Sequence, residues 1–308
     1  MGTEFERGLR RIAGVARPRV LLYWNRGLGD IALGLCALFA RVRESSPGAQ
    51  ISVLTRPDLE EAFRLTDVDV VLASPGLQRG DPRGYENACA RLGIDASGYD
   101  LVFERPDPSA WIADGVGRFV PRLRWRGEWN ALVERFPQVP GDDGIVIAAH
   151  VSSETAQFYG YVKDWPTACW RELVARFAGD ARLRWVLFGH AQPEPFDLPG
   201  VVDLRGRTGF LDVLSLIRNR ARVLIAVDSG ILSVAYYLDE QFPLEVVSLW
   251  SDPRQGVLKQ GVESPNRGLR HVALVGDGED VRRLAVDSVE GAVRAALSRV
   301  QRVAGPDA

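Results

Sequence analysis

The segment that most limits how this chain can fold is an apolar run that enters a glycine-punctuated turn. The apolar run is 20–24, the turn is Gly-Leu-Gly-Asp at 27–30, and an amphipathic run follows at 31–43. This order predicts a strand, a tight turn and a helix, the first unit of an open α/β sheet. Ligands bind such sheets at the carboxyl ends of the strands, so we expect Asp30 at the mouth of a cleft. A helix N-cap is the alternative role for this aspartate.

Apolar and amphipathic runs alternate through the rest of the chain, which predicts parallel α/β units. The predicted strands are 20–24, 51–54, 68–72, 99–103, 145–149, 184–188, 223–227, 246–249 and 271–274. The predicted helices are 31–43, 58–65, 84–92, 166–177, 210–219, 231–238 and 281–300. Pro166 suits the first turn of its helix, where its missing N–H is not needed.

A stretch dense in Pro, Gly and Asp at 136–144 interrupts this alternation and predicts a linker. A chain of 308 residues is also too long for one ordinary core. We therefore expect a Rossmann-like α/β domain on each side of the linker, at 19–135 and at 145–308, with a C-terminal helix in the second. Residues 1–18 are expected to be a partly disordered or weakly helical extension. A ligand is expected in the cleft between the domains.

Composition narrows the class of protein. Apolar residues make up 46% of the chain and charged residues 25%, as in globular proteins. The net charge of -2 gives no electrostatic basis for binding nucleic acid or for a polybasic membrane anchor. The cysteines form no CxxC pair, no apolar run approaches the ~20 residues of a membrane span, and the N-terminus lacks a signal-peptide core. We expect a cytoplasmic protein.

The first turn also satisfies the loose dinucleotide-binding pattern, as Gly27-x-Gly29-x-x-Ala32. That pattern expects an acidic residue at the end of the second strand, where it would bind the ribose. Arg56 follows that strand instead, and an arginine there could accept the 2′-phosphate of NADP. Asp30, however, would repel a pyrophosphate at the start of the helix. An NADP-binding oxidoreductase is therefore the less favoured interpretation.

Candidate phosphate ligands follow the strand 145–149. Lys163 is one of only two lysines in an arginine-rich chain, and it precedes the helix 166–177. Its compact charge suits a phosphate, although a solvated surface lysine is the alternative. The hydroxyls of Ser152 and Ser153 could donate to phosphate oxygens or cap a turn.

Two further loops follow predicted strands of the second domain. Glu194 could bind ribose hydroxyls, with a solvated side chain as the alternative. His190 lies in the same loop without a second histidine or carboxylate at metal-ligand spacing, so no metal site is expected. The segment Asp228-Ser229-Gly230 joins an apolar strand directly to a helix. Free N–H groups at such a helix start can bind an anion, or the side chains can cap them.

Taken together, these segments resemble the heptosyltransferase-like glycosyltransferases of family 9, the bacterial lipopolysaccharide-core class. The resemblance covers 19–298. It rests on four segments in this order: a GxxGD-type turn at 26–30, a Pro-containing turn into the second strand at 46–51, a Lys-x-Trp-Pro segment at 163–166, and a segment beginning Asp-Ser-Gly at 228–235. The resemblance implies the GT-B fold, in which two Rossmann-like α/β lobes face each other across a cleft.

The resemblance also implies a reaction, the inverting transfer of a heptose or related sugar from an ADP-linked donor to an acceptor hydroxyl, with no metal or cofactor. It makes Asp30 the general base, which Gly27 and Gly29 position. It assigns the donor and its phosphates to Ser152, Ser153, Lys163, Glu194, Asp228, Ser229, Gly230 and Ser233. These roles agree with the chemistry, because a departing nucleoside diphosphate needs cations and N–H donors, and an attacking hydroxyl needs a carboxylate. The first domain then serves the acceptor and the second the donor.

Three positions depart from the family pattern. Ser233 replaces the usual histidine, Cys36 replaces the usual proline, and 250–256 alters a glycine-rich segment. These changes leave the donor sugar and its base open. They also leave a second alternative, a non-catalytic nucleotide-sugar-binding protein with the same fold.

The acceptor could be a saccharide, a lipid-linked glycan or a protein hydroxyl. A lipid-linked acceptor would bring the protein to the surface of the inner membrane. An arginine–tryptophan cluster could meet an anionic saccharide, because arginine binds phosphate and indoles stack on sugars. Partial burial of these side chains is the alternative. The cluster is Trp111, Arg118, Arg122, Arg124, Trp125, Arg126 and Trp129.

Overall fold

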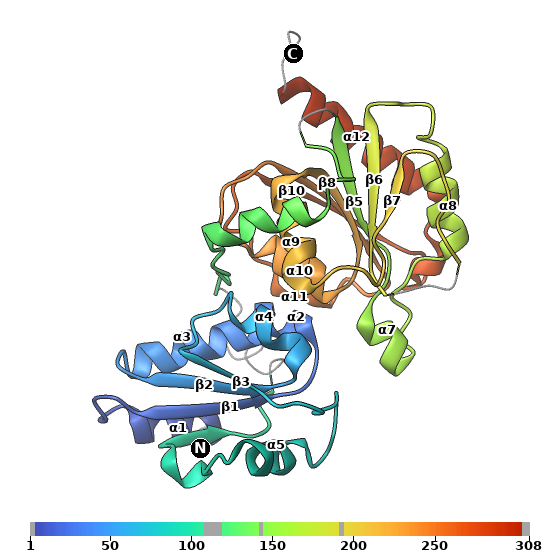
Figure 1. The fold of residues 1–308 in the computed structure, drawn as a ribbon. Helices are drawn as coiled ribbons and strands as arrows, with labels where there is room; N and C mark the ends of the chain where they lie inside the picture. Colours follow the sequence, from blue (N-terminus) through green and yellow to red (C-terminus); the bar gives the residue numbers. More distant parts are fainter. Residues whose placement is uncertain (1–3, 108–118, 142–143, 191–193, 304–308) are drawn as a thin grey trace. The chain divides into compact units, whose positions relative to one another are not determined.

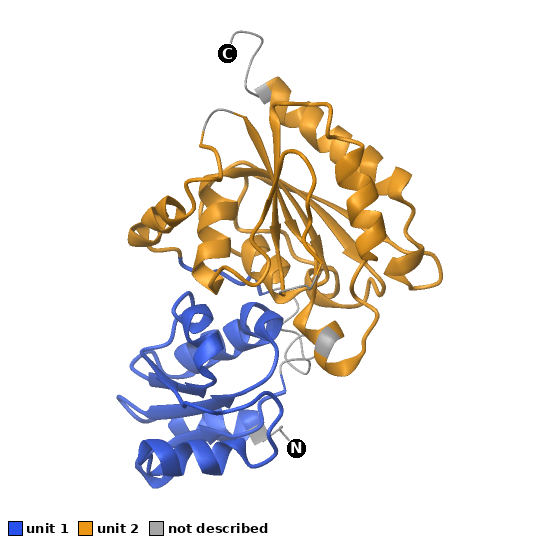
Figure 2. Cartoon of the chain, turned by 45° about the vertical axis from the view of Figure 1, so that its right-hand side comes forward, with its two compact units in different colours: residues 1–124 blue, residues 125–308 orange. Residues whose placement is uncertain are grey.

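A computed structural model describes residues 4–107, 119–141, 144–190 and 194–303. The chain divides into two compact units, Met1–Arg124 and Trp125–Ala308 (Figure 2). Each unit is built on one parallel sheet with helices on its faces (Figure 1). The expectation of two Rossmann-like α/β units is therefore confirmed.

The sheet of the first unit has the strand order β3-β2-β1-β4, with every neighbouring pair parallel. Its strands are β1 (Arg19–Trp24), β2 (Gln50–Thr55), β3 (Val70–Ala73) and β4 (Leu101–Phe103). Five consecutive residues of β1, from 20 to 24, are buried. This continuous burial is typical of a central parallel strand that is covered on both faces, and it explains why the run is apolar throughout.

Helices cover both faces of this sheet. They are α1 (Glu4–Ile12), α2 (Leu28–Asp30), the π-helical turn η1 (Ile31–Leu35), α3 (Cys36–Ser45), η2 (Pro57–Leu59), α4 (Glu60–Phe63), α5 (Gly84–Leu92) and η3 (Ala96–Gly98). On one face, α5 shares a hydrophobic cluster with Leu21 and Tyr23 of β1. Predicted helix 31–43 is thus observed as two parts, a π-helical turn followed by an α-helix.

The expected extension 1–18 is more ordered than we expected, because α1 packs on the unit. Leu9 and Ile12, one turn apart, are 5% and 0% exposed. Gly8 lies so close to β4 that an ideal Cβ there would be 2.7 Å from Leu101 Cδ1. The apolar pair at this helical spacing gives the helix a face that it can bury.

The sheet of the second unit has six parallel strands in the order β10-β9-β8-β5-β6-β7. They are β5 (Ile145–His150), β6 (Leu183–Phe188), β7 (Val201–Asp203), β8 (Ala221–Val227), β9 (Leu244–Trp250) and β10 (Leu269–Val275). The five strands predicted for this half are confirmed, and β7 is an additional strand. It has only three residues and lies at the sheet edge, so it leaves no periodicity to detect.

The helices of the second unit are η5 (Gly127–Arg135), α7 (Glu154–Tyr159), α8 (Thr167–Ala175), α9 (Phe210–Asn219), α10 (Gly230–Tyr236), α11 (Gly256–Gln260), η6 (Val281–Arg283) and α12 (Val286–Val303). α8 and α12 share one core with alternate residues of β5 and β8. Figure 1 shows α9 and α10 on the other side of the sheet. We expected Pro166 in the first turn of its helix. It is instead the N-cap of α8, one residue before that turn. None of the described helices is both long and apolar enough to cross a membrane.

The boundary between the units lies before Trp125, whereas we expected the linker at 136–144. Residues 125–135 fall in the second unit because η5 is bonded to α9. The Ser215 hydroxyl donates to the Trp129 carbonyl over 2.8 Å, and Arg135 pairs with Asp212 at 2.7 Å. The described part of the expected linker, 136–141 and 144, thus lies within the second unit.

The substitution Trp129→Ala tests this boundary. Trp129 is 8% exposed, and removing a buried indole costs about 3–5 kcal/mol, so α9 should open more often and its amides exchange faster. Amides of β1, in the other unit, should keep their rates. Hydrogen–deuterium exchange with mass spectrometry measures both, and Glu134→Ala, at an exposed position of the same helix, is the control. Equal acceleration in β1 would contradict the placement of 125–135.

Candidate functional site

The loops at one edge of the second unit's sheet carry most of the predicted donor residues. Because all six strands are parallel, the carboxyl ends of β5, β6, β8 and β9 lie at the same edge. The connections also run to opposite sides of β5, toward β6 in one direction and β8 in the other. Such a reversal in strand order is where open α/β sheets form a ligand crevice.

A buried ion pair joins the loops after β5 and β8. Lys163 Nζ lies 2.6 Å from Asp228 Oδ2, and the two side chains are only 16% and 11% exposed. Burial raises the pKa of Asp228, while the charge of Lys163 beside it acts in the opposite direction. An ammonium has three N–H donors, so the pair leaves Lys163 donors for a further anion. The structure therefore brings together two of the predicted residues.

Ser152 and Ser153 hold the turn after β5 in place. Ser152 Oγ accepts the backbone N–H of His190 over 2.9 Å, and the Ser153 N–H donates to Asp164 Oδ1 over 2.7 Å. Gly189 has φ +133°, and an ideal Cβ there would lie 2.4 Å from Ser152 Oγ, so only glycine fits. The Ser152 hydroxyl keeps its own proton to donate to a ligand.

A hollow of about 330 Å³ opens beside these residues. Its lining combines two cations with hydroxyl, imidazole and backbone groups and one carboxylate, that of Asp164, which accepts the Ser153 N–H; the two cations outnumber the carboxylate, which suits a diphosphate. The lining residues are Ser152, Ala156, Gly160, Tyr161, Val162, Lys163, Asp164, His190 and Arg282. Arg282 was not singled out in the sequence, and it pairs with Asp280 at 2.7 Å. Within the described ranges, no group of three or more His, Cys, Asp or Glu side chains is arranged to hold a metal ion.

The first turn of α10 uses the hydroxyls of both its serines. Ser229 is the N-cap and its Oγ accepts the Leu232 N–H over 3.3 Å. The Ser233 hydroxyl donates to the Ser229 carbonyl over 3.4 Å. Gly230 is the first helical residue and is partly exposed, whereas both serines are buried. Both hydroxyls thus form hydrogen bonds at the start of α10. This arrangement is the capping that the sequence analysis gave as the alternative to anion binding.

Gly256 is a site residue that the sequence analysis missed. It has φ +52°, and an ideal Cβ on it would lie 3.1 Å from Asp228 Oδ1 and 2.8 Å from the Trp250 ring. The first residue of α11 therefore lies beside the carboxylate of Asp228. The positive φ and the close contact both need glycine, and the signal available in the sequence was that Gly256 ends the altered glycine-rich segment 250–256.

Glu194 lies apart from this group within the described residues. Its side chain is exposed, and its backbone carbonyl accepts Arg205 Nη2 over 2.9 Å. It is absent from the lining of the hollow. The structure thus does not bring Glu194 together with Lys163 and Asp228, and its ribose-binding role stays a prediction.

Asp30 belongs to the first unit and does not cap a helix. It is the last residue of α2, with helical φ and ψ of -65° and -24°, and its side chain makes no capping hydrogen bond. Its carboxylate lies against Gly27, whose ideal Cβ would be 3.1 Å from Asp30 Oδ2 and 3.5 Å from Arg79 Nη2. The turn therefore places a carboxylate and a guanidinium around one glycine. The buried π-helical turn that follows is of a kind often found at functional sites.

Arg56, the residue that left NADP open, is buried. Its side chain is 6% exposed and pairs with Asp58 at 3.2 Å, and its Nη2 donates to the Arg26 carbonyl over 3.3 Å. A guanidinium in this position is not presented to a 2′-phosphate. The geometry thus disfavours the dinucleotide interpretation.

The described members of the arginine–tryptophan cluster are divided between the two units. Trp125 and Trp129 are each 8% exposed and pack edge to face, with ring centroids 5.2 Å apart. They belong to the second unit, whereas Arg122 and Arg124 belong to the first. Trp111 and Arg118 lie outside the described residues. Trp125 precedes η5 and Trp129 lies in it; both indoles are buried and are not available to stack on a sugar.

No protein-family model matches the chain, and no curated protein matches it significantly. Solved structures match nearly all of it. An ADP-heptose lps heptosyltransferase II of E. coli aligns with a TM-score of 0.62 at 17% identity, covering 92% of this chain and 99% of that one. A glycosyl transferase family 9 protein of Veillonella parvula DSM 2008 gives 0.61 at 14% identity, covering 92% and 97%. The chain has the GT-B fold.

A third match is the E. coli heptosyltransferase WaaC with ADP-2-deoxy-2-fluoro heptose. It aligns with a TM-score of 0.52 at 16% identity and covers 90% of this chain and 99% of that one. The fold that the motifs imply is therefore confirmed over nearly the whole length. At these identities the likeness concerns the fold alone.

His150, at the end of β5, makes stability depend on pH. It is 8% exposed, its Nδ1 has no hydrogen-bond partner among the described residues, and burial lowers its pKa from 6.5 to about 3. Between these values the unfolded chain takes up a proton that the folded protein excludes. Stability is therefore complete above pH 6.5 and falls with acidification by up to about 1.4 kcal/mol per pH unit.

The substitution His150→Phe should flatten this acid dependence. Urea unfolding of the wild type and the variant from pH 7 down toward pH 4 measures it. His271→Phe is the comparison, because burial lowers the pKa of His271 to about 4 and it too should contribute a slope. An unchanged slope in His150→Phe would show that His150 is not buried in its neutral form.

Proposed function

We propose that the protein is an inverting glycosyltransferase, similar to family 9 heptosyltransferases, that moves a heptose or related sugar from an ADP-linked donor to an acceptor hydroxyl. The observation that carries the proposal is the hollow beside the Lys163–Asp228 pair, at the strand-order reversal of a GT-B chain. Structures with this fold include an ADP-heptose heptosyltransferase. We therefore propose an ADP-linked sugar as the donor.

The second unit is proposed to hold the donor. Lys163 and Arg282 supply positive charge to the hollow, and the Ser152 hydroxyl can donate a hydrogen bond. These groups oppose the charge that develops on the diphosphate as its bond to the sugar breaks. Asp228 holds the Lys163 ammonium at 2.6 Å, so that the cation is positioned before the donor arrives.

Asp30 of the first unit is proposed to be the general base. Its carboxylate takes the proton of the acceptor hydroxyl as the oxygen attacks the anomeric carbon from the face opposite the phosphate. One carbon–oxygen bond forms while the bond to the terminal phosphate of ADP breaks, and ADP leaves with the electron pair. A single displacement of this kind inverts the anomeric carbon. Positioned proton transfer of this type contributes roughly 10²–10⁴-fold in rate.

A non-catalytic nucleotide-sugar-binding protein is the second candidate. The observation that favours it is Ser233, which replaces the family histidine and bonds to the Ser229 carbonyl. The two candidates share donor binding and differ in turnover. Asp30 therefore separates them.

The substitution Asp30→Asn should lower turnover of an ADP sugar by about 10²–10⁴-fold and leave binding of ADP unchanged. Release of ADP in the presence of acceptors measures the first, and ligand-dependent melting measures the second. Glu44→Gln, at an exposed acid of the same unit, is the control. A wild type that binds ADP but consumes no activated sugar with any acceptor would favour the binding protein.

The substitution Lys163→Gln should weaken ADP binding by at least about tenfold, because a charge-assisted contact to phosphate is lost. The chain offers a matched control in Lys259→Gln, since its second lysine is exposed at the end of α11. The double variant Lys163→Gln/Asp228→Asn avoids a buried unpaired carboxylate and checks that the fold is intact. Melting shifts with ADP, UDP, GDP and CDP measure affinity and base preference. A preference for another base would overturn the ADP assignment.

A further inference from the structure

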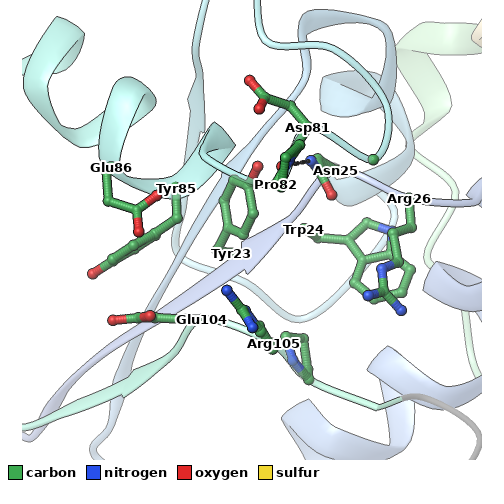
Figure 3. A pocket seen from close by; sticks show the side chains of 12 residues that line it. Tyr23, Trp24, Asn25, Arg26, Asp81, Pro82, Tyr85, Glu86, Glu104 and Arg105 are labelled. Atoms are coloured by element: carbon green, nitrogen blue, oxygen red, sulfur yellow. Dashed lines mark hydrogen bonds between the residues drawn. The ribbon is translucent and has the colours of Figure 1, made fainter.

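A hollow of about 290 Å³ in the first unit has polar groups that are already buried or bonded (Figure 3). It lies at the carboxyl end of β1, where the Tyr23 hydroxyl has almost no accessible surface. The amide of Asn25 is already used, because its Nδ2 donates to the Gln78 and Asp81 carbonyls over 3.3 and 3.4 Å. Backbone groups that could bind another molecule are found instead at the edge of the larger sheet.

The described residues form four sheet edges, and β10 is the longest of the edge strands. β3, β4 and β7 have four, three and three residues, whereas β10 has seven. Short edge strands, lysine, proline and bulges are ways in which proteins prevent edge-to-edge association. β10 contains no lysine or proline and pairs with β9 in one unbroken register, and its one charged side chain, Arg270, lies near its start. Its free edge therefore lacks these protections.

The backbone groups of every second residue of β10 point away from β9. The Gly268 carbonyl accepts the Leu244 N–H over 3.1 Å, and the Gly276 N–H donates to the Trp250 carbonyl over 2.9 Å. Because backbone direction alternates along a strand, the even-numbered residues between them also face β9. The residues whose N–H and C=O groups face outward are His271, Ala273 and Val275. These groups have no hydrogen-bond partner among the described residues.

Apolar side chains are exposed along the same edge. Val272 and Val275 are 37% and 40% exposed, and Ala273 between them is exposed as well. Successive side chains of a strand point to opposite faces, so Val272 and Val275 lie on different faces of the sheet. A strand added beside β10 would therefore cover apolar surface on both faces and pair the outward backbone groups.

The charges at the two ends of β10 have opposite signs. Within three residues of the strand, the charged residues are Arg267 before it and Asp277 after it. Both are exposed, as is Arg270, and none of the three has an ion-pair partner among the described residues. A second copy of β10 in antiparallel orientation would bring each basic end beside an acidic end, whereas a parallel copy would bring like charges together. The edge is thus complementary to itself.

We propose that two copies of the chain associate through β10, antiparallel, around a twofold axis at Ala273, so that one sheet continues through both copies. Ala273 then pairs with Ala273 of the second copy and His271 with Val275, and each pair exchanges both N–H···O bonds. Val272 lies opposite Leu274 of the second copy, which makes an apolar cross-strand contact. Such a contact uses the same surface on both copies and closes at two. The inference goes beyond the proposed function and does not depend on it.

The concentration dependence of association tests the proposal. Small interfaces are typical of weak, reversible complexes, so we expect a dissociation constant of about 10–100 µM. Sedimentation velocity of the full chain between about 1 and 300 µM should show monomer giving way to dimer. Hydrogen–deuterium exchange in 269–276 should slow over the same range, because the outward amides become bonded. A chain that stays monomeric, or a dimer that leaves exchange in 269–276 unchanged, would overturn the proposal.

The substitution Ala273→Lys tests the pairing directly. It places two ammonium groups opposite each other at the twofold axis and should weaken the dimer by at least about tenfold. The position is exposed, so the melting temperature of the monomer should stay the same. Ala178→Lys, at an exposed alanine of the same unit, is the matched control and should associate like the wild type.

Ala273→Pro is a second variant of the same residue. Its N–H faces outward, so a proline there removes no bond to β9 and is tolerated at an edge, but it cannot donate to a second copy. This variant should fold and remain monomeric. Undiminished association in either variant of Ala273 would overturn the proposal.

Exchange of the end charges tests the antiparallel orientation. Arg267→Glu and Asp277→Lys should each weaken the dimer by about threefold, because like charges then meet at both ends of the interface. The double variant Arg267→Glu/Asp277→Lys restores opposite charges and should associate like the wild type. Additive weakening in the double variant would overturn the antiparallel pairing.

Discussion

Parallel pairing in both sheets is the constraint on which the rest of this structure depends. A parallel strand can be followed by another only after a crossover, so every strand of a unit ends at the same edge. In the second unit this edge collects Ser152, Lys163 and Asp228, which are up to 76 positions apart in the chain. The nearly continuous burial of β8 holds this strand in register, because a shift along its neighbours would move its apolar side chains out of the core.

The Lys163–Asp228 pair shows how one contact can serve both the fold and a ligand. Burial opposes the charge on Asp228, and the lysine beside it compensates, so neither side chain is stable in this place without the other. The pair therefore holds two loops together in the absence of a donor. An anion that enters the hollow meets a cation that is already oriented.

Periodicity and turn residues predicted the strands and the long helices. A strand buried on both faces is a run of consecutive apolar residues, and a helix packed on a sheet has apolar residues at helical spacing. β1 and α5 fall almost where the apolar runs place them. The three-residue β7 and the domain boundary could not be predicted in this way. The placement of η5 depends on bonds to Ser215 and Asp212, some 80 positions further along the chain, and no local pattern encodes them.

The site was predictable where a loop follows a strand and not where distant loops meet. Lys163 and Asp228 were found from their positions after strands, whereas Gly256 and Arg282 depend on tertiary contacts. Serines were ambiguous for a physical reason. A hydroxyl before a helix can bind a ligand or cap the helix with the same atoms, and Ser229 caps.

The π-helical turn after Asp30 has a consequence for how this region can vary. A π turn accommodates one residue more than an α turn, so α3 is rotated by about 100° from where an uninterrupted α-helix would carry it. The buried face of α3 and the direction of the Asp30 carboxylate are thus set by the number of residues between them. If a single residue were deleted from Ile31–Leu35, α3 could not keep its apolar face buried while the Asp30 carboxylate kept its present direction. The number of residues in this segment therefore matters more for the position of Asp30 than the identity of their side chains.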